Sequence, residues 1–404
     1  MTDDNINKKS KIRMIFSGLL PLFVLGHFSH HLLTALPGPM LPFIRNEFRL
    51  DYTRAGFVLT AFNIAYGVSQ LPAGWLADRL GPRVLILIGI CGVALAGLLV
   101  SFSNNYIIML VFLAIMGIAG GGYHPAAAPL VSTTLEPHQR GQALGFHTIG
   151  GSFSFFLSPL LAAAIAGAWG WRSSFLVLAI PTMILGIVLY ILLARHASTG
   201  RAQLAITRSQ EGAPTKQGNW RHIIALMVLV VFTQSMLWSL AALLPIFMVD
   251  NFGIAEEAGA IFLSIFCSAG MWASPLGGHL SDRFGKVRVL LICCFFIGPL
   301  IYLLGLVPYG GGISIGALVL VLGALLYVVM PTTESYLVEY APAKHRSTVL
   351  GTYYFLAIET GGIWAPLIGF LFDRLGFGLS FTALGGAVLV LTSICSVFLR
   401  DQHN

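Results

Sequence analysis

Residues 74–83 of this 404-residue chain read GWLADRLGPR, and residues 278–288 read GHLSDRFGKVR. Both copies contain the pattern Gly-x-x-x-Asp-Arg-x-Gly, and Asp282 of the second copy follows Asp78 of the first by 204 residues. Three other features recur at nearly the same spacing: RGQALG at 140–145 as RSTVLG at 346–351, Pro125 as Pro331, and Pro42 as Pro245. The near-constant spacing indicates that the chain is a duplicated unit.

The composition predicts a membrane protein. Hydrophobic residues make up 56% of the chain and charged residues only 10%, whereas an ordinary soluble domain carries about 25% charged residues. Apolar runs of roughly 20 residues, long enough to cross a bilayer core as a helix, recur along the whole sequence. These runs are continuous rather than alternating, which favours helices over the strands of a membrane barrel. We therefore expect an all-α polytopic membrane protein.

Twelve spans are predicted, in two sets of six that are separated by one long polar loop. The spans lie near 14–41, 54–76, 83–102, 106–131, 142–168, 173–194, 222–249, 257–280, 287–307, 313–338, 348–371 and 378–399. The loop divides the chain into an N-terminal six-helix half at 1–194, a linker at 195–221 and a C-terminal six-helix half at 222–404. Repeats of this kind place a substrate site at their interface, near the bilayer midplane.

The distribution of Lys and Arg predicts the orientation. If the N-terminus is cytoplasmic, most of the 23 basic residues fall on the cytoplasmic side, as the positive-inside rule requires. Both termini are therefore expected to be cytoplasmic, in a multi-pass protein of the inner or plasma membrane. The basic loops account for most of the net charge of +7, so the charge indicates no nucleic-acid partner.

The five cysteines indicate neither a disulfide framework nor a metal site. All of them lie inside predicted spans, and none has the spacing of a metal ligand. They are Cys91, Cys267, Cys293, Cys294 and Cys395. We expect buried free thiols.

The twelve spans, the central loop and the duplicated motif resemble the major facilitator superfamily over nearly the whole chain. The resemblance implies two pseudo-symmetric halves, with spans 1, 4, 7 and 10 around a cavity and spans 2, 5, 8 and 11 beside them. It also implies that the motif ties the halves together on the cytoplasmic side. The motif residues are Gly74, Asp78, Arg79, Gly81, Arg83, Gly278, Asp282, Arg283 and Gly285.

The chemistry of the motif suits a gate, because a carboxylate at a helix end can face another helix's N-terminal dipole and an arginine. Pro82 stands where the family usually has a basic residue, so the first copy is expected to bind more weakly. Asp78 and Asp282 can instead be simple solvated turn residues, and this alternative stays open.

Two stretches are similar to the fosmidomycin-resistance branch of the superfamily. They read GGGYHPAAAPLVS at 120–132 and RGQALGFHTIGGSFSFFLSPLLAA at 140–163. Drug–proton antiporters often carry an arginine in span 4 and a Gly-Pro pair in span 5. Here span 4 has no arginine, and span 5 has Gly150-Gly151 and Ser158-Pro159.

Seven ionisable residues lie deep inside the predicted spans. Such a residue costs a few kcal/mol or more at bilayer depth, so each is a candidate for function. They are His27, His30, His31, His124, His147, Glu334 and Glu359. All seven fall on spans 1, 4, 5, 10 or 11, which the resemblance places at or beside the cavity.

The two glutamates are candidates for proton coupling. Glu359 lies near the middle of span 11, where a buried carboxylate can take up and release a proton during transport. A neutral acid that is bonded to a neighbouring helix is the alternative. Glu334 follows Pro331 in span 10, and both a contact at the cytoplasmic gate and proton coupling are open for it.

The stretch HFSHH at 27–31 is unusual inside an apolar span. His27 and His31 are four residues apart and share one helix face, and His30 lies beside that face. A proton- or substrate-binding cluster, plain hydrogen bonding between helices and a metal site are all open. Two such histidines can bind a metal, but no Asp, Glu or Cys accompanies them in span 1. We therefore predict no metal ligands.

The repeat supplies partners for these histidines. It maps His30 and His31 onto Gln234 and Ser235 of span 7, with Trp238 one turn further along. We expect the two sets to face each other across the cavity, with Tyr123 and Trp238 as aromatic walls. His124 and His147 are expected to help close the inner gate or to relay protons, and a structural role is the alternative.

These features predict a proton-coupled secondary transporter that moves a small organic solute by alternating access, with efflux of a drug or metabolite by antiport preferred. The alternative is proton-linked uptake of a small nutrient or carboxylate, and a third reading is transport of a divalent metal or metal chelate through the span 1 histidines. The sequence lacks the phosphate-loop pattern and a catalytic set, so neither an enzyme nor a cofactor is predicted. The expected partners are substrate, protons and membrane lipid, and the expected state is a monomer.

Overall fold

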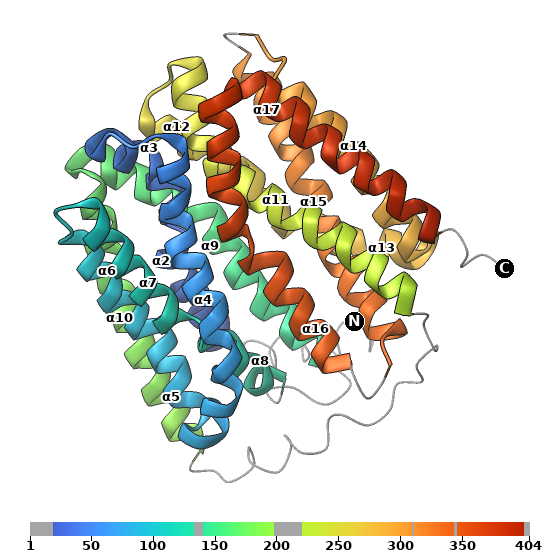
Figure 1. Ribbon diagram of the computed structural model, residues 1–404. Coiled ribbons are helices and arrows are strands. Elements are labelled where there is room, and N and C mark those ends of the chain that lie inside the picture. The colour runs from blue at the N-terminus through green and yellow to red at the C-terminus, as the bar shows by residue number, and fades with distance from the viewer. Residues whose placement is uncertain (1–18, 133–139, 198–219, 309–310, 343–345, 400–404) are drawn as a thin grey trace, which may run out of the picture. The chain divides into compact units, whose positions relative to one another are not determined.

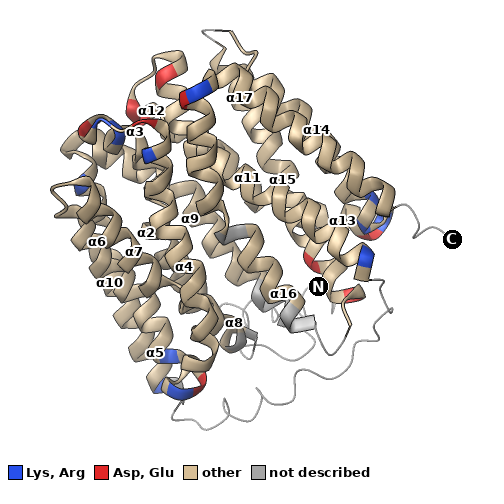
Figure 2. Cartoon of the chain, viewed as in Figure 1, with Lys and Arg blue, Asp and Glu red and all other residues tan. Residues whose placement is uncertain are grey.

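A computed structural model of the chain describes residues 19–132, 140–197, 220–308, 311–342 and 346–399. Nearly all of these residues are helical, and no strand occurs among them (Figure 1). The prediction of an all-α protein is confirmed. Figure 2 shows that charged residues lie mostly at or near helix ends, which is the pattern expected of helices that cross an apolar layer.

Two compact units make up the chain, and each is described by itself. Over the described residues, the first unit consists of residues 19–36, 65–132, 140–158 and 172–197. The second consists of residues 37–64, 159–171, 220–308, 311–342 and 346–399. The linker prediction at 195–221 falls mostly outside the described residues, so the division into halves at that loop stays a prediction.

The first unit contains most of the helices that precede residue 198. Its helices are α2 (Leu20–Thr34), most of α4 (Tyr52–Leu80), α5 (Pro82–Leu87), the π-helical turn η1 (Ile88–Gly92), α6 (Val93–Ser101), α7 (Tyr106–Gly120), α8 (Tyr123–Ser132), most of α9 (Arg140–Trp169) and α10 (Trp171–Ala197).

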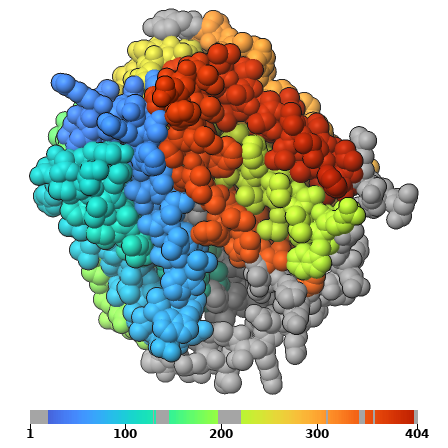
Figure 3. Space-filling view, in the orientation of Figure 1, coloured from blue at the N-terminus to red at the C-terminus, as the bar shows by residue number. Residues whose placement is uncertain are grey.

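The second unit contains the remaining helices, the start of α4 and the end of α9. They are α3 (Pro37–Phe48), α11 (Trp220–Phe252), α12 (Glu256–Ser268), the 3₁₀ turn η4 (Ala269–Met271), α13 (Ala273–Phe284), α14 (Lys286–Leu304), α15 (Gly312–Tyr340), α16 (Arg346–Tyr354), the π-helical turn η6 (Phe355–Glu359) and α17 (Gly361–Leu399). Figure 3 shows α17 lying along α11.

Eight helical segments of the described chain are long and apolar enough to cross a membrane, or nine if the bent pair α12–α13 is one span. That pair bends by 45°. One of the eight, Val349–Leu399, contains both predicted spans 11 and 12. The helix α2 has only 15 residues. The polar residues Asn63, Tyr66 and Gln70 interrupt the apolar sequence of α4. Twelve crossings and cytoplasmic termini therefore stay predictions.

Positive φ angles repeat along the chain. The described residues with positive φ are Arg49 and Gly253, Gly81 and Gly285, and Gly170 and Gly376, which form three pairs at the spacing of the sequence repeat. Gly81 (φ 86°, ψ 141°) and Gly285 (φ 89°, ψ 135°) close the two copies of the opening motif. This conformation is close to a region that is essentially limited to glycine. The last glycine of the motif is therefore required by the backbone, and the paired angles support the duplication.

Two predicted spans are interrupted where the histidines lie. Predicted span 1 breaks between α2 and α3, because Pro37 has no N–H to donate and disfavours helix at the residue before it. Predicted span 4 breaks at Gly121-Gly122, between α7 and α8. His31 consequently lies in the last turn of α2, and His124 lies in the first turn of α8.

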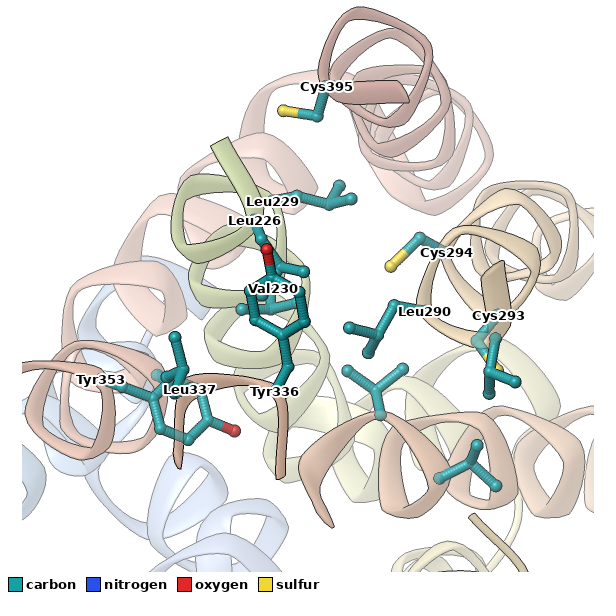
Figure 4. Close-up of a cluster of buried hydrophobic side chains, with 14 of the residues drawn as sticks. Leu226, Leu229, Val230, Leu290, Cys293, Cys294, Tyr336, Leu337, Tyr353 and Cys395 are labelled. Atoms are coloured by element: carbon teal, nitrogen blue, oxygen red, sulfur yellow. The ribbon is translucent and has the colours of Figure 1, made fainter. Parts of the chain in front are cut away.

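Apolar packing holds the second unit together. Figure 4 shows Leu226, Leu229 and Val230 of α11 beside Leu290 and Cys294 of α14, and all five are buried. The thiols behave as small apolar groups here. All five cysteines of the chain are free and buried, as predicted.

Candidate functional site

Five histidines converge inside the first unit, and they are called the histidine cluster below. They are His27, His30 and His31 of α2, His124 of α8 and His147 of α9. The ring centroid of His27 lies 4.1 Å from that of His147, 4.8 Å from that of His31 and 5.2 Å from that of His124. The sequence singled out all five residues one by one, and the fold brings them into a single group.

His30 is fully buried, and both of its ring nitrogens have protein partners. Nδ1 lies 2.9 Å from the backbone oxygen of Gly89, and Nε2 lies 2.9 Å from the hydroxyl of Tyr66. A carbonyl only accepts, so Nδ1 donates to it and the neutral ring accepts from Tyr66 through Nε2. The ring also stacks on Tyr123, with centroids 4.5 Å apart. His30 therefore has no nitrogen left for a ligand.

His27 has one ring nitrogen without a hydrogen-bond partner among the described residues, and His31 is bonded through its Nδ1. Nδ1 of His27 donates to the backbone oxygen of His147 at 2.7 Å, while its Nε2 is buried with no partner among the residues that the structure describes. Nδ1 of His31 lies 2.9 Å from Oγ1 of Thr34. A buried polar atom without a partner costs about 1–3 kcal/mol, so such atoms call for an explanation.

His124 completes a triad with these two histidines. Its ring centroid is 5.3 Å from that of His31. One ligand atom from each of His27, His31 and His124 can be chosen so that all three lie within 4.8 Å of one another. Within the described part of the chain, this is the set of side chains that is arranged to bind a metal ion. The sequence did not predict it, because the third ligand comes from another helix.

Small residues and aromatic rings form the walls of the cluster. A Cβ on Gly151 of α9 would lie 2.6 Å from Cε1 of His27, so only glycine fits against that ring. Phe155, one turn further along α9, packs on His31 with centroids 4.6 Å apart. Tyr123 is fully buried, and its hydroxyl has no partner among the described residues. The Gly150-Gly151 pair that replaces a Gly-Pro pair in the sequence thus has a packing role here.

The second unit contains its own polar group. The amide of Gln234 on α11 lies 3.0–3.1 Å from the hydroxyl of Tyr353 on α16, and both residues are buried. Glu334 of α15 interacts with the hydroxyl of Tyr354. Trp238 packs edge-on against Phe266 and Tyr327, with centroids about 6 Å apart. The expectation that this group faces the histidine cluster stays a prediction.

The second unit contains a polar network that the sequence did not predict. Arg45 of α3 pairs with Asp250 of α11 at 2.5 Å, and the hydroxyl of Tyr52 also donates to Asp250. Burial and this hydrogen bond raise the pKa of Tyr52 above its ordinary value. Asp373 of α17 accepts from the backbone N–H groups of Tyr52 and Thr53 at 3.0 and 2.9 Å. The partners are up to 321 residues apart, so no local sequence signal connects them.

Comparison with known proteins now identifies the family. The sequence profile of the Major Facilitator Superfamily matches residues 23–366 and 224–404. The chain belongs to this superfamily. It is 23% identical over 401 residues to the fosmidomycin resistance protein of Escherichia coli, which covers 98% of this chain and 95% of the relative. It is 25% identical over 384 residues to a probable sulfoacetate transporter of Cupriavidus necator, with 89% and 88% covered.

Solved structures agree on the fold. A transporter of the POT family, in complex with a thioalcohol-conjugated peptide, superposes with a TM-score of 0.79 at 16% identity over 95% of this chain and 96% of that chain. The superfamily and the relatives are transporters of small solutes, so the predictions that this chain is a multi-pass protein of the cell membrane and not an enzyme are confirmed. The predicted similarity to the fosmidomycin-resistance branch is also confirmed.

The superfamily motif is exposed in this structure. Asp78 and Asp282 lie on the surface, and neither has an ion pair within the described ranges. Arg79 stacks over Trp75 of its own helix at 4.1 Å, and Arg83 donates to the backbone oxygen of Leu193 at 3.5 Å. The gating role of the motif stays a prediction. The side chain of Glu359 lies outside the described residues, and its predicted role is likewise untested.

Proposed function

We propose that this superfamily member is a proton-coupled secondary transporter that exports a small organic solute by alternating access. The observation that carries the proposal is the histidine cluster, which brings five imidazoles and a buried tyrosine together inside apolar helices. Intramembrane ionisable residues are costly and mark substrate or ion pathways by default. The buried Nε2 of His27 and the buried hydroxyl of Tyr123 have no partner among the described residues, and a bound solute would supply one.

The proton step is assigned to the two glutamates. Glu334 is half-buried between apolar helices, and the groups that interact with it are the hydroxyls of Tyr353 and Tyr354 rather than a basic side chain. A carboxyl group in such surroundings is more stable in its neutral, protonated form, and its charged form is costly. A group that is protonated at rest and charged only transiently suits a proton carrier. Glu359 is the last residue of the π-helical turn η6, and turns of this kind occur frequently at functional sites.

The names of the relatives support two different candidates for direction and solute. The fosmidomycin resistance protein supports export, and we take export as the first candidate. The second candidate is proton-linked uptake of a small carboxylate or sulfonate, and the probable sulfoacetate transporter supports such an anion as the solute. Unpaired donors such as the hydroxyl of Tyr123 would suit an anionic solute of either kind.

Proteoliposomes with an imposed pH gradient test the proposal. Uptake of labelled fosmidomycin, sulfoacetate and related small anions is measured with and without the gradient. We expect the gradient to drive flux of at least one solute, and Glu334→Gln or Glu359→Gln to abolish this drive while leaving exchange of solute for solute intact. Glu257→Gln, in the first turn of α12, is the control and should behave as the wild type. Flux that ignores the pH gradient in the wild type would refute proton coupling.

A further inference from the structure

The geometry points to a binding site for a divalent transition-metal ion formed by His27, His31 and His124, with the fourth coordination position open to an anionic group of the solute. The metal part of this inference stands on the histidines alone. The part that concerns the solute rests on the proposed function, because it names the class of compound that the transporter would carry, namely an anionic metal chelate.

The three rings already have the spacing of ligands around one metal. A tetrahedral ion with metal–nitrogen bonds of about 2.0–2.1 Å places the centroids of its imidazole ligands roughly 5 Å apart. The observed centroid separations within the triad are 4.8, 5.2 and 5.3 Å. The rings are also inclined to one another, by 53°, 87° and 35°, so they are not a parallel stack.

The ligand nitrogens must move slightly closer when the ion binds. Tetrahedral geometry sets the three nitrogens roughly 3.3 Å apart. In the structure, the three ligand atoms lie within 4.8 Å of one another. Closure of at most about 1.5 Å is within reach of side-chain rotation at the end of α2 and the start of α8. Both of these helix ends lie where a predicted span is interrupted rather than inside a continuous helix.

The hydrogen bonds of His27 and His31 support metal binding by the other nitrogen of each of these two rings. A histidine ligand almost always donates its remaining N–H to a carbonyl, carboxylate or water, which fixes the tautomer and aims the ring. His27 makes this contact with the backbone oxygen of His147, and its Nε2 is left buried and unpartnered in the described chain. His31 makes the corresponding contact with Thr34. His30 is excluded from the ligand set because both of its nitrogens are taken.

The ligand type selects the metal. Neutral imidazole suits Zn²⁺, Cu²⁺, Ni²⁺ and Co²⁺, whereas Mg²⁺ and Ca²⁺ prefer oxygen ligands. The triad contains no carboxylate and no thiolate, so it adds no negative charge to the site.

The charge of the metal ion predicts an anionic ligand in the fourth coordination position. Three neutral ligands leave both positive charges of the metal uncompensated, and an uncompensated charge is costly in an apolar interior. An anionic donor from the solute in the fourth position removes this cost. Tyr123 can stabilise such a donor, because its buried hydroxyl has no partner among the described residues and its ring lies 5.4 Å from His124 and 5.8 Å from His27.

Titration of the tag-free full chain in detergent with Co²⁺ tests the metal site directly, because tetrahedral Co²⁺ gives a visible absorption band. Zn²⁺ is titrated by calorimetry in parallel. We expect one saturable ion per chain, and Zn²⁺ should displace Co²⁺. Each of His27→Ala, His31→Ala and His124→Ala should weaken binding at least tenfold. His279→Ala removes an exposed histidine and should leave binding unchanged.

A second variant keeps every ligand in place. Gly151→Ala adds a Cβ that would lie 2.6 Å from the ring of His27, so it should weaken Co²⁺ binding although all three histidines remain. Size-exclusion profiles and melting temperatures show which variants are folded. Absence of saturable binding by the wild type, or equal loss in His279→Ala and the triad variants, would overturn the metal site.

Transport measurements separate this inference from the proposed function. If a pH gradient drives solute flux but no metal binds, the metal site is refuted and the proposed function stands. If Co²⁺ binds at the triad but no gradient drives flux, proton coupling is refuted and the metal site stands. Addition of Zn²⁺ should raise the flux of chelating anions several-fold over that of non-chelating anions of the same charge. Equal flux would refute the chelate as substrate.

Discussion

Replacement of Asp373 by alanine is expected to destabilise the second unit, because this side chain caps a helix that is far away in the sequence. The first N–H groups of α4 have no partner inside the helix. Asp373 accepts from the backbone nitrogens of Tyr52 and Thr53 at 3.0 and 2.9 Å and from Oγ1 of Thr53 at 2.6 Å. Asp373→Ala removes all three interactions at once.

The exposure of Asp373 determines how much folding free energy is lost in Asp373→Ala. Three hydrogen bonds to a charged group at about 1.5–3 kcal/mol each would sum to a large value. Asp373 is exposed, however, so water can replace the lost acceptor. The loss should therefore lie near the upper value for an N-cap, about 2 kcal/mol. Asp373→Asn keeps one acceptor and should lose about half of this, roughly 1 kcal/mol.

The five buried thiols provide the assay. A thiol-reactive fluorogenic dye reports unfolding when the cysteines become accessible, since all five are buried and free in the folded chain. A loss of about 2 kcal/mol corresponds to a fall of roughly 4 °C in melting temperature for a chain of this size, and the asparagine variant should fall by roughly 2 °C. Arg374→Ala changes the next residue, whose guanidinium only stacks at 5.6 Å on Phe370, and is the control. Equal melting temperatures for Asp373→Ala and the wild type would refute the remote cap.

Three further predictions use the same melting assay. Gly285→Ala should lower stability by about 1–3 kcal/mol because φ is 89°, whereas Gly278→Ala, where an added Cβ meets nothing within 4 Å, should be neutral or stabilising by up to about 1 kcal/mol; equal effects would contradict the backbone argument. Tyr66→Phe removes the hydroxyl that donates to His30 and should cost about 1–3 kcal/mol, and an unchanged melting temperature would show that this nitrogen has another partner. Arg49→Gly should raise stability by up to about 1 kcal/mol, since Arg49 has φ 52°; a loss of stability would show that the arginine side chain contributes more than its backbone strain costs.

The sequence predicted the family and singled out the residues of the histidine cluster for one physical reason. An apolar chain makes every polar residue conspicuous, so the deep histidines stood out although nothing was known of their neighbours. The duplicated motif was equally visible, and Gly81 and Gly285 show why it needs its final glycine. The number of crossings was harder to fix. Spans that carry polar residues, such as α4, fall below the hydropathy of ordinary membrane helices, and spans such as α2 break at proline.

By itself the sequence determined that this chain is helical, duplicated and apolar, because these properties depend on composition and on local or periodic patterns. Tertiary structure alone decided that His124 joins His27 and His31, that His30 is already fully bonded, and that Asp373 caps α4. The reason is that a hydrogen bond or a ligand set depends on which atoms meet, within a few tenths of an ångström, between helices far apart in the chain. No pattern along the sequence specifies those distances.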